Sequence, residues 1–268
     1  MEPIRVGDLV VQPIFDGTAV LDPANWAGSD WTNHRHLIGD DGRITVPVGA
    51  FLVRIAGKLL MLDAGVGKVR NAMFDGGAML DNLAALGVQP TDIDVIMVSH
   101  LHPDHAGWLE HDGVSTFPRA TVHVGAADWD HFVVNAAMGS RRADRLRVVE
   151  GQVDLIDRDG VTILPGVTTR ATPGHTPGHT SAIISSGDER LIVLGDSLHC
   201  PAQLTETEWQ FIYDVDADLA VRTRQALMQE AETAGTVLLP CHFPGMQAAR
   251  LVPAQGTKRW IVGASSAY

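Results

Sequence analysis

Four side chains that can bind a metal lie within six positions of one another, in the stretch Ser-His-Leu-His-Pro-Asp-His-Ala-Gly-Trp that covers residues 99–108. They are His100, His102, Asp104 and His105. Imidazole nitrogens bind zinc, iron, cobalt and similar ions, and a carboxylate adds an oxygen ligand. Polar side chains packed this densely need partners. The spacing therefore predicts a metal site, and these four residues alone are compatible with one bound ion or with two.

The sequence around this cluster places it on a loop at the end of a core strand. Residues 94–98 form a short apolar, β-branched run that predicts a buried strand. Pro103 and Gly107 then prevent a simple continuation of the strand. Functional side chains concentrate on loops of this kind, which a rigid strand positions.

Three later segments offer further ligands at the ends of predicted strands, and a dinuclear site needs roughly seven or eight donor positions. Residues 172–179 read Thr-Pro-Gly-His-Thr-Pro-Gly-His and include His175 and His179. Asp196 follows the apolar run 191–194, and His242 follows the run 236–240. These positions could complete two coordination shells.

Composition narrows the class of protein and its partners. The chain has 268 residues, of which 45% are hydrophobic and 19% charged, which suits one globular domain over residues 1–268. A net charge of −12 argues against a nucleic-acid partner. Two cysteines cannot build a disulfide framework. Because no signal peptide or membrane-spanning run is evident, we expect a cytoplasmic protein without a membrane partner.

Apolar periodicity predicts both strands and helices along the chain. The predicted strands cover residues 4–15, 48–55, 58–63, 94–98, 121–124, 153–156, 161–169, 180–185, 191–194, 236–240 and 260–262. The predicted helices cover residues 78–87, 126–138 and 216–234, the last with Asp216 as its N-cap and Gly235 as its stop. Residues 16–47 are rich in Gly and Asp and predict a loop-rich insert, which could act as a lid or as the interface of a homodimer. The alternative is a packed surface extension whose Trp side chains fill the edge of the core.

The order of elements predicts an α/β fold of four layers. In the first half of the chain, two predicted strands, a helix and a third strand lead to His100. In the second half, elements of the same kinds in the same order lead to His242. Two β-rich halves of this kind are satisfied by an αββα sandwich, in which two mixed sheets face each other with helices outside. This arrangement brings the ends of the strands, and with them the candidate ligands, to one edge.

The motifs resemble those of the metallo-β-lactamase-fold hydrolases. The resemblance rests on His100-x-His102-x-Asp104-His105, on the TPGH and Gly-Asp segments, and on Cys-His-Phe-Pro-Gly at 241–245, in that order. It implies that His100, His102 and His175 hold one metal, that Asp104, His105 and His242 hold the other, and that Asp196 bridges them. His179 would then be a supporting residue, and Asp63 would orient a ligand histidine.

The resemblance also implies a mechanism. Two divalent ions, zinc first among them with iron, manganese or cobalt as alternatives, would hold a bridging hydroxide that attacks the substrate. Asp104 would carry a proton to the leaving group. His199, three residues after Asp196, occupies a position where the related lactonases often have a tyrosine, and it could donate a hydrogen bond to the reacting oxygen. A purely structural histidine at 199 is the alternative.

Among these hydrolases, segments 211–216 and 241–245 are most similar to the acyl-homoserine lactonase and methyl-parathion-hydrolase-like group. The predicted substrate is a small lactone or carboxylic ester, with promiscuous cleavage of aryl esters or phosphotriesters. The alternatives are a glyoxalase-II-like thioesterase, a β-lactamase-like hydrolase, a mononuclear iron dioxygenase and a non-catalytic metal-binding protein. We expect an apolar pocket, for which the candidates are Trp26, Trp31, Met138, Trp209, Phe211 and Phe243. Packing in the hydrophobic core is the alternative for each of them.

Overall fold

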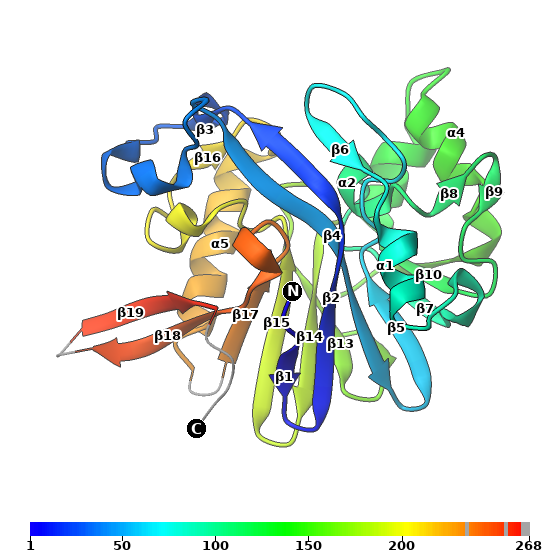
Figure 1. Ribbon diagram of the computed structural model, residues 1–268. Helices are drawn as coiled ribbons and strands as arrows, with labels where there is room; N and C mark the ends of the chain where they lie inside the picture. The colour runs from blue at the N-terminus through cyan, green and yellow to red at the C-terminus, as the bar shows by residue number, and fades with distance from the viewer. Residues whose placement is uncertain (234–235, 255–256, 264–268) are drawn as a thin grey trace.

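The computed structural model describes residues 1–233, 236–254 and 257–263, which form two facing β-sheets with helices on both outer sides (Figure 1). The first sheet has the order β1-β2-β4-β5-β7-β10-β11, with β6 paired to β2. The second has the order β12-β13-β14-β15-β17-β18-β19. The predicted αββα sandwich is therefore confirmed.

The strands of the first sheet are β1 (Ile4–Val6), β2 (Leu9–Leu21), β4 (Ile44–Ile55), β5 (Lys58–Leu62), β6 (Phe74–Gly76), β7 (Val95–Met97), β10 (Thr121–Gly125) and β11 (Val153–Ile156). Those of the second are β12 (Thr162–Leu164), β13 (Val167–Ala171), β14 (Thr180–Ser186), β15 (Glu189–Gly195), β17 (Thr236–Pro240), β18 (Ala249–Ala254) and β19 (Thr257–Val262). Two short pairs lie outside these sheets: β3 (Trp26–Ala27) with β16 (Gln210–Phe211), and β8 (Glu110–His111) with β9 (Val114–Ser115).

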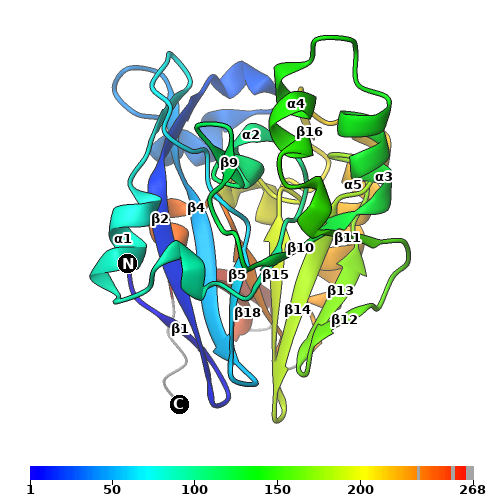
Figure 2. The same ribbon diagram turned by 90° about the vertical axis from the view of Figure 1, so that its right-hand side faces the viewer.

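The helices cover the outer faces of the two sheets. On the first sheet lie α1 (Met79–Ala85), α2 (Pro103–Ala106), α3 (Ala126–Trp129) and α4 (Arg141–Arg147), on the side that faces the viewer in Figure 2. On the second sheet lies α5 (Ala217–Glu230), where the side chain of Asp216 accepts a hydrogen bond from the Leu219 amide and so caps the helix as predicted. The predicted stop at Gly235 is outside the described residues.

Alternating side chains of the central strands build the layers. On β5, Leu59 and Met61 pack with the helices of the first outer layer, whereas Leu60 and Leu62 pack between the two sheets. Because successive residues of a strand point to opposite faces, a strand that is covered on both sides must be apolar throughout. This explains why 59–62 reads Leu-Leu-Met-Leu without polar alternation.

The predicted repetition between the two halves is present in the strand pairing. β4 runs antiparallel to β5, which runs parallel to β7, and His100 follows shortly after. β14 runs antiparallel to β15, which runs parallel to β17, and His242 follows. The segments that follow the carboxyl ends of β7, β15 and β17 therefore carry the candidate ligands other than His175, which follows β13.

Two predictions need correction. The loop-rich insert is shorter than 16–47, because residues 16–21 continue β2 and residues 44–47 begin β4; the remainder holds the 3₁₀-helices η1 (Pro23–Asn25) and η2 (Trp31–Leu37) around β3. The helix predicted over 126–138 ends at Trp129 and continues only as one turn of π-helix, η4 (Asp130–Val134). A turn of π-helix is typical of functional sites.

The remaining short turns are the 3₁₀-helices η3 (Pro90–Asp92), η5 (Glu150–Gln152), η6 (Pro201–Leu204) and η7 (Pro244–Met246). Among the described residues, no helix is both long and apolar enough to cross a membrane.

Candidate metal centre

The first four predicted ligands come together on one loop and its short helix. His100 follows β7, His102 precedes α2, and Asp104 and His105 lie on α2 itself. His100 and His105 are fully buried, whereas Asp104 is partly accessible. The Pro103 ring is tolerated because it occupies the first turn of the helix.

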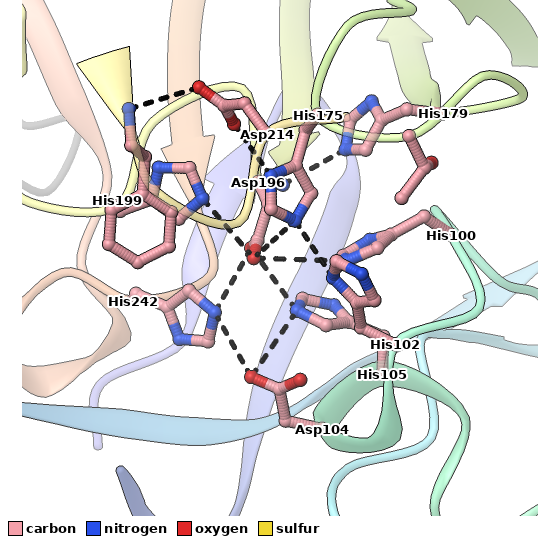
Figure 3. Close-up of polar contacts among 12 residues, drawn as sticks. His100, His102, Asp104, His105, His175, His179, Asp196, His199, Asp214 and His242 are labelled. Carbon is pink, nitrogen blue, oxygen red and sulfur yellow. Dashed lines mark hydrogen bonds and ion pairs between the residues drawn. The ribbon is translucent and has the colours of Figure 1, made fainter. Parts of the chain in front are cut away.

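The second sheet brings the other three ligands to the same place (Figure 3). His175 lies between β13 and β14, Asp196 follows β15, and His242 follows β17. The donor atoms form two groups, each with atoms no more than 4.8 Å apart: His100, His102 and His175, and then Asp104, His105, Asp196 and His242. All seven predicted ligands are thus brought together.

The carboxylate of Asp196 lies between the two groups. Its Oδ1 is 3.1 Å from His105 Nε2 and 3.0 Å from His242 Nε2. Its Oδ2 is 3.5 Å from His175 Nε2 and 3.8 Å from His100 Nε2. One oxygen faces each group, which is the geometry expected of a bridging ligand.

The chemistry of these donors fits bound cations. His105 Nε2 and Asp196 Oδ1 are buried and have no hydrogen-bond partner among the described residues. His102 Nδ1 lies 3.0 Å from His100 Nε2 and 2.9 Å from His175 Nε2, so three ring nitrogens converge. Burial and the neighbouring His175 lower the pKa of His102 to about 2, which keeps it in the neutral form that binds metals.

In three of the ligand histidines, the ring nitrogen that points away from the other donors forms a hydrogen bond with an acceptor of the protein, which orients the ring. His105 Nδ1 donates to Asp63 Oδ2 at 2.8 Å, as the sequence predicted for Asp63. His242 Nδ1 donates to the Pro47 carbonyl at 2.9 Å. His175 Nδ1 donates to Asp214 Oδ1 at 2.8 Å, and Asp214 had no predicted role.

Asp128 is a second residue that sequence reasoning missed. Its buried carboxylate accepts hydrogen bonds from the Leu101 amide, the Thr176 hydroxyl and the Gly178 amide. Leu101 belongs to the first ligand loop, whereas Thr176 and Gly178 belong to the loop that carries His175. Asp128 therefore ties together two ligand loops that are far apart in the sequence.

His179 has the supporting position that was predicted. Its Nε2 accepts a hydrogen bond from the Asp196 amide at 3.0 Å, and its Nδ1 donates to Thr172 Oγ1 at 2.8 Å. Burial and the nearby His175 lower its pKa to about 3, so the ring is neutral. Gly195, which directly precedes Asp196, has a φ of 54°, and a Cβ at this position would lie 2.6 Å from His179 Nε2. A glycine at 195 therefore leaves the space that this hydrogen bond needs.

We expect replacement of His179 by alanine to weaken metal affinity by about 10- to 100-fold, because the Asp196 amide loses its acceptor. Glutamine, which offers one acceptor and one donor, should restore part of that affinity. Zinc titration against a chromophoric chelator measures the change. The exposed His131, replaced by alanine, is the matched control. Equal affinity in the His179→Ala and His131→Ala variants would contradict a positioning role.

The metal centre opens into a cavity of about 220 Å³. His102, Asp104, His175, Asp196, His199 and His242 form one side of it, and the rest is lined by Ala19, Leu21, Val46, Met73, Phe74, Pro103, Arg142, Phe211 and Tyr213. His199 stacks on Phe211 with ring centroids 3.9 Å apart, and its Nε2 lies 3.6 Å from Asp196 Oδ2. Both ring nitrogens of His199 are buried and lack partners among the described residues.

Of the six aromatic or methionine side chains predicted for the pocket, only Phe211 lines it. Trp26 is 1% exposed and packs against Phe211, and Trp31 and Trp209 pack against each other. Phe243 is buried beside α5, and Met138 points into solvent. The prediction is confirmed for Phe211 and wrong for the other five, because hydrophobicity alone does not specify which face of a loop a side chain will occupy.

The model of the metallo-beta-lactamase superfamily matches residues 44–240, and the chain belongs to this superfamily. Its relatives include an N-acyl homoserine lactonase of Bacillus sp., which is 28% identical over 61% of this chain and 63% of the relative. Another is the N-acyl homoserine lactonase AttM of Rhizobium radiobacter, 31% identical over 43% of this chain and 44% of the relative. The aligned part thus spans less than two thirds of either lactonase.

Solved structures of the same fold match almost the whole chain. The hydrolase AbOPH of the beta lactamase superfamily is 26% identical, covers 97% of this chain and 96% of its own, and has a TM-score of 0.79. AidC, a dizinc quorum-quenching lactonase, is 22% identical, covers 100% of this chain and 97% of its own, and has a TM-score of 0.83. These matches agree with the sandwich fold described above.

Proposed function

We propose that the chain is a metal-dependent hydrolase with a dinuclear site that cleaves a lactone or a carboxylic ester. The observation that carries this proposal is the carboxylate of Asp196, with one oxygen facing each of two groups of donors. His100, His102 and His175 would hold one divalent ion, and Asp104, His105 and His242 the other. Zinc is the ion we propose first, because a relative of the same fold is a dizinc lactonase.

When bound, the two ions supply a water nucleophile at neutral pH and stabilise negative charge on the reacting oxygens. The residues of this chain contribute the rest. Asp104 Oδ2 lies 3.6 Å from His242 Nε2 at the cavity wall, where it can pass a proton to the departing alcohol. His199 can donate a hydrogen bond to the carbonyl oxygen of the substrate.

The substrate class is proposed from the relatives and from the cavity. Lactonases are prominent among the curated relatives, and the cavity wall opposite the metal ligands is largely apolar. An apolar wall suits the acyl part of an ester. Cleavage of aryl esters and phosphotriesters would then be side activities of the same site.

Assays of the zinc-loaded protein against N-acyl homoserine lactones, aryl esters, paraoxon and a glutathione thioester test this proposal. We expect turnover of a lactone or ester at least about 10-fold faster than that of the thioester, measured as kcat/KM. Fast thioester cleavage with no ester or lactone turnover would replace this function by that of a thioesterase. Binding of fewer than two ions per chain would contradict the dinuclear site.

A further inference from the structure

Arg142 is a cation at the wall of the metal-site cavity, and the proposed reaction does not use it. It lies on α4, and its guanidinium carbon is 4.8 Å from the centre of the Phe132 ring. That ring is in turn 5.6 Å from the ring of His102. Arg142 is therefore held beside the metal centre by a cation–π contact, which limits where its charge can move.

The guanidinium of Arg142 has neither a hydrogen bond nor an ion pair with the residues that the structure describes. Its neighbours on α4 differ: Arg145 donates to Glu110 Oε2 and to the Gly107 carbonyl, and Arg147 donates to Asp144 and to the Val133 carbonyl. Arg142 is nevertheless partly buried. Five donors taken partly out of water without an acceptor are unfavourable, and a bound anion would relieve this cost.

The charge of Arg142 distinguishes it from the rest of the cavity wall. It is the one lysine or arginine among the described residues that line the cavity, whose wall away from the metal ligands is mainly aliphatic and aromatic. A second cavity of about 460 Å³ shares His102, Pro103 and Arg142 with the first. Arg142 thus borders free space on the side of a second cavity as well as the metal-site cavity.

We propose that Arg142 binds a carboxylate of the substrate, so that the preferred lactones or esters carry a second, ionised carboxyl group. A guanidinium matches a carboxylate with two parallel hydrogen bonds, which gives both affinity and orientation. This inference rests on the proposed function, because it defines the substrate class of the same site.

Two matched pairs of esters test the inference with the zinc-loaded protein. The first pair is 4-carboxyphenyl acetate and its neutral analogue 4-acetylphenyl acetate, which place the group on the leaving alcohol. The second pair is monophenyl adipate and phenyl 6-oxoheptanoate, which place it on the acyl part. We expect the protein to prefer the anionic ester of at least one pair by about 10-fold or more in kcat/KM.

The variant Arg142→Gln should lose about 10- to 100-fold on the preferred anionic ester and change less than about threefold on its neutral analogue. Arg147→Gln removes the same charge from the same helix outside both cavities and should leave both rates unchanged. Zinc content of each variant shows whether the metal centre is intact. Equal losses on both members of a pair, or no preference by the native protein, would overturn the inference. If the native protein cleaves neither an ester nor a lactone, the proposed function itself fails; if it cleaves a lactone but none of the four esters, only the inference about Arg142 is overturned.

Discussion

Replacing Asp196 by asparagine is expected to lower kcat/KM for a lactone or ester by about 1,000-fold or more and to leave the protein with fewer than two zinc ions per chain. Asparagine keeps the shape of the side chain but exchanges one oxygen for an amide nitrogen and removes the charge. That amide would direct hydrogens toward His105 and His242 or toward His100 and His175. Either orientation removes one side of the bridge.

The electrostatics of the metal-free site support the same expectation. Burial opposes ionisation of Asp196, but His105 and His242 outweigh it and hold the pKa of the carboxyl well below its usual range. The pKa of His105 is correspondingly raised well above its ordinary value by Asp196 and Asp63, in spite of burial. The carboxyl group of Asp196 is therefore ionised at neutral pH, as a ligand of two cations must be.

The matched control is Asp112→Asn, which removes one exposed carboxylate. Asp112 has a φ of 51°, and asparagine tolerates this left-handed region as well as aspartate does. Thermal unfolding of the metal-free variants checks that each still folds. Full activity with two bound zinc ions in Asp196→Asn, relative to Asp112→Asn, would show that Asp196 does not bridge the metals.

Sequence reasoning reached the ligands because their signals are local. His100, His102, Asp104 and His105 are recognisable within one short loop, and Asp196 and His242 each follow an apolar strand directly. The layers of the fold could be predicted for the same reason, since the periodicity of apolar residues and the order of the strands can be identified directly in the sequence. Strand ends that share one edge of the sandwich then bring the ligands together.

The residues that hold the ligands in place could not be predicted in this way. Asp128 accepts hydrogen bonds from amides 27 and 50 positions away, and Asp214 orients His175 from 39 positions away. Asp128 lies in no motif, and Asp214 lies in segment 211–216, whose resemblance to the lactonases gave it no role of its own. Arg142 faces the metal centre because the π-helical turn η4 places Phe132 beneath it, and periodicity predicted an ordinary helix there.

Asp16 makes more such long-range contacts than Asp128 or Asp214, and the sequence predicted only that it begins the loop-rich insert. It lies at a register shift in β2, where its carboxylate is fully buried. Its Oδ2 accepts hydrogen bonds from the amides of Val66 and Gly67, at 2.7 and 3.0 Å. Its Oδ1 accepts from the amides of Gly77 and Met79 and from Trp108 Nε1.

Replacing Asp16 by alanine is therefore expected to lower the free energy of unfolding by about 4 kcal/mol or more, a large part of the total for a single domain. Four buried donors, the amides of Val66, Gly67 and Met79 and the Trp108 indole, would lose their acceptor, and each unsatisfied donor costs about 1–3 kcal/mol. The half-buried Gly77 amide keeps the backbone carbonyl of Asp16 as an acceptor, at 3.1 Å. Asparagine keeps one carbonyl oxygen and should cost roughly half as much. Urea unfolding of the metal-free protein measures both changes.

The exposed Asp8, replaced by alanine, should change the free energy of unfolding by no more than about 0.5 kcal/mol and serves as the control. The effect of Asp16 should also reach the metal centre. Residues 64–65 are bound to the ligand loop through Ala64 N to the His105 carbonyl at 2.7 Å and Gly107 N to the Gly65 carbonyl at 2.8 Å. Loosening the segment that Asp16 holds would therefore loosen the loop that carries His105. A loss below about 1 kcal/mol in Asp16→Ala would mean that water replaces the carboxylate at these donors.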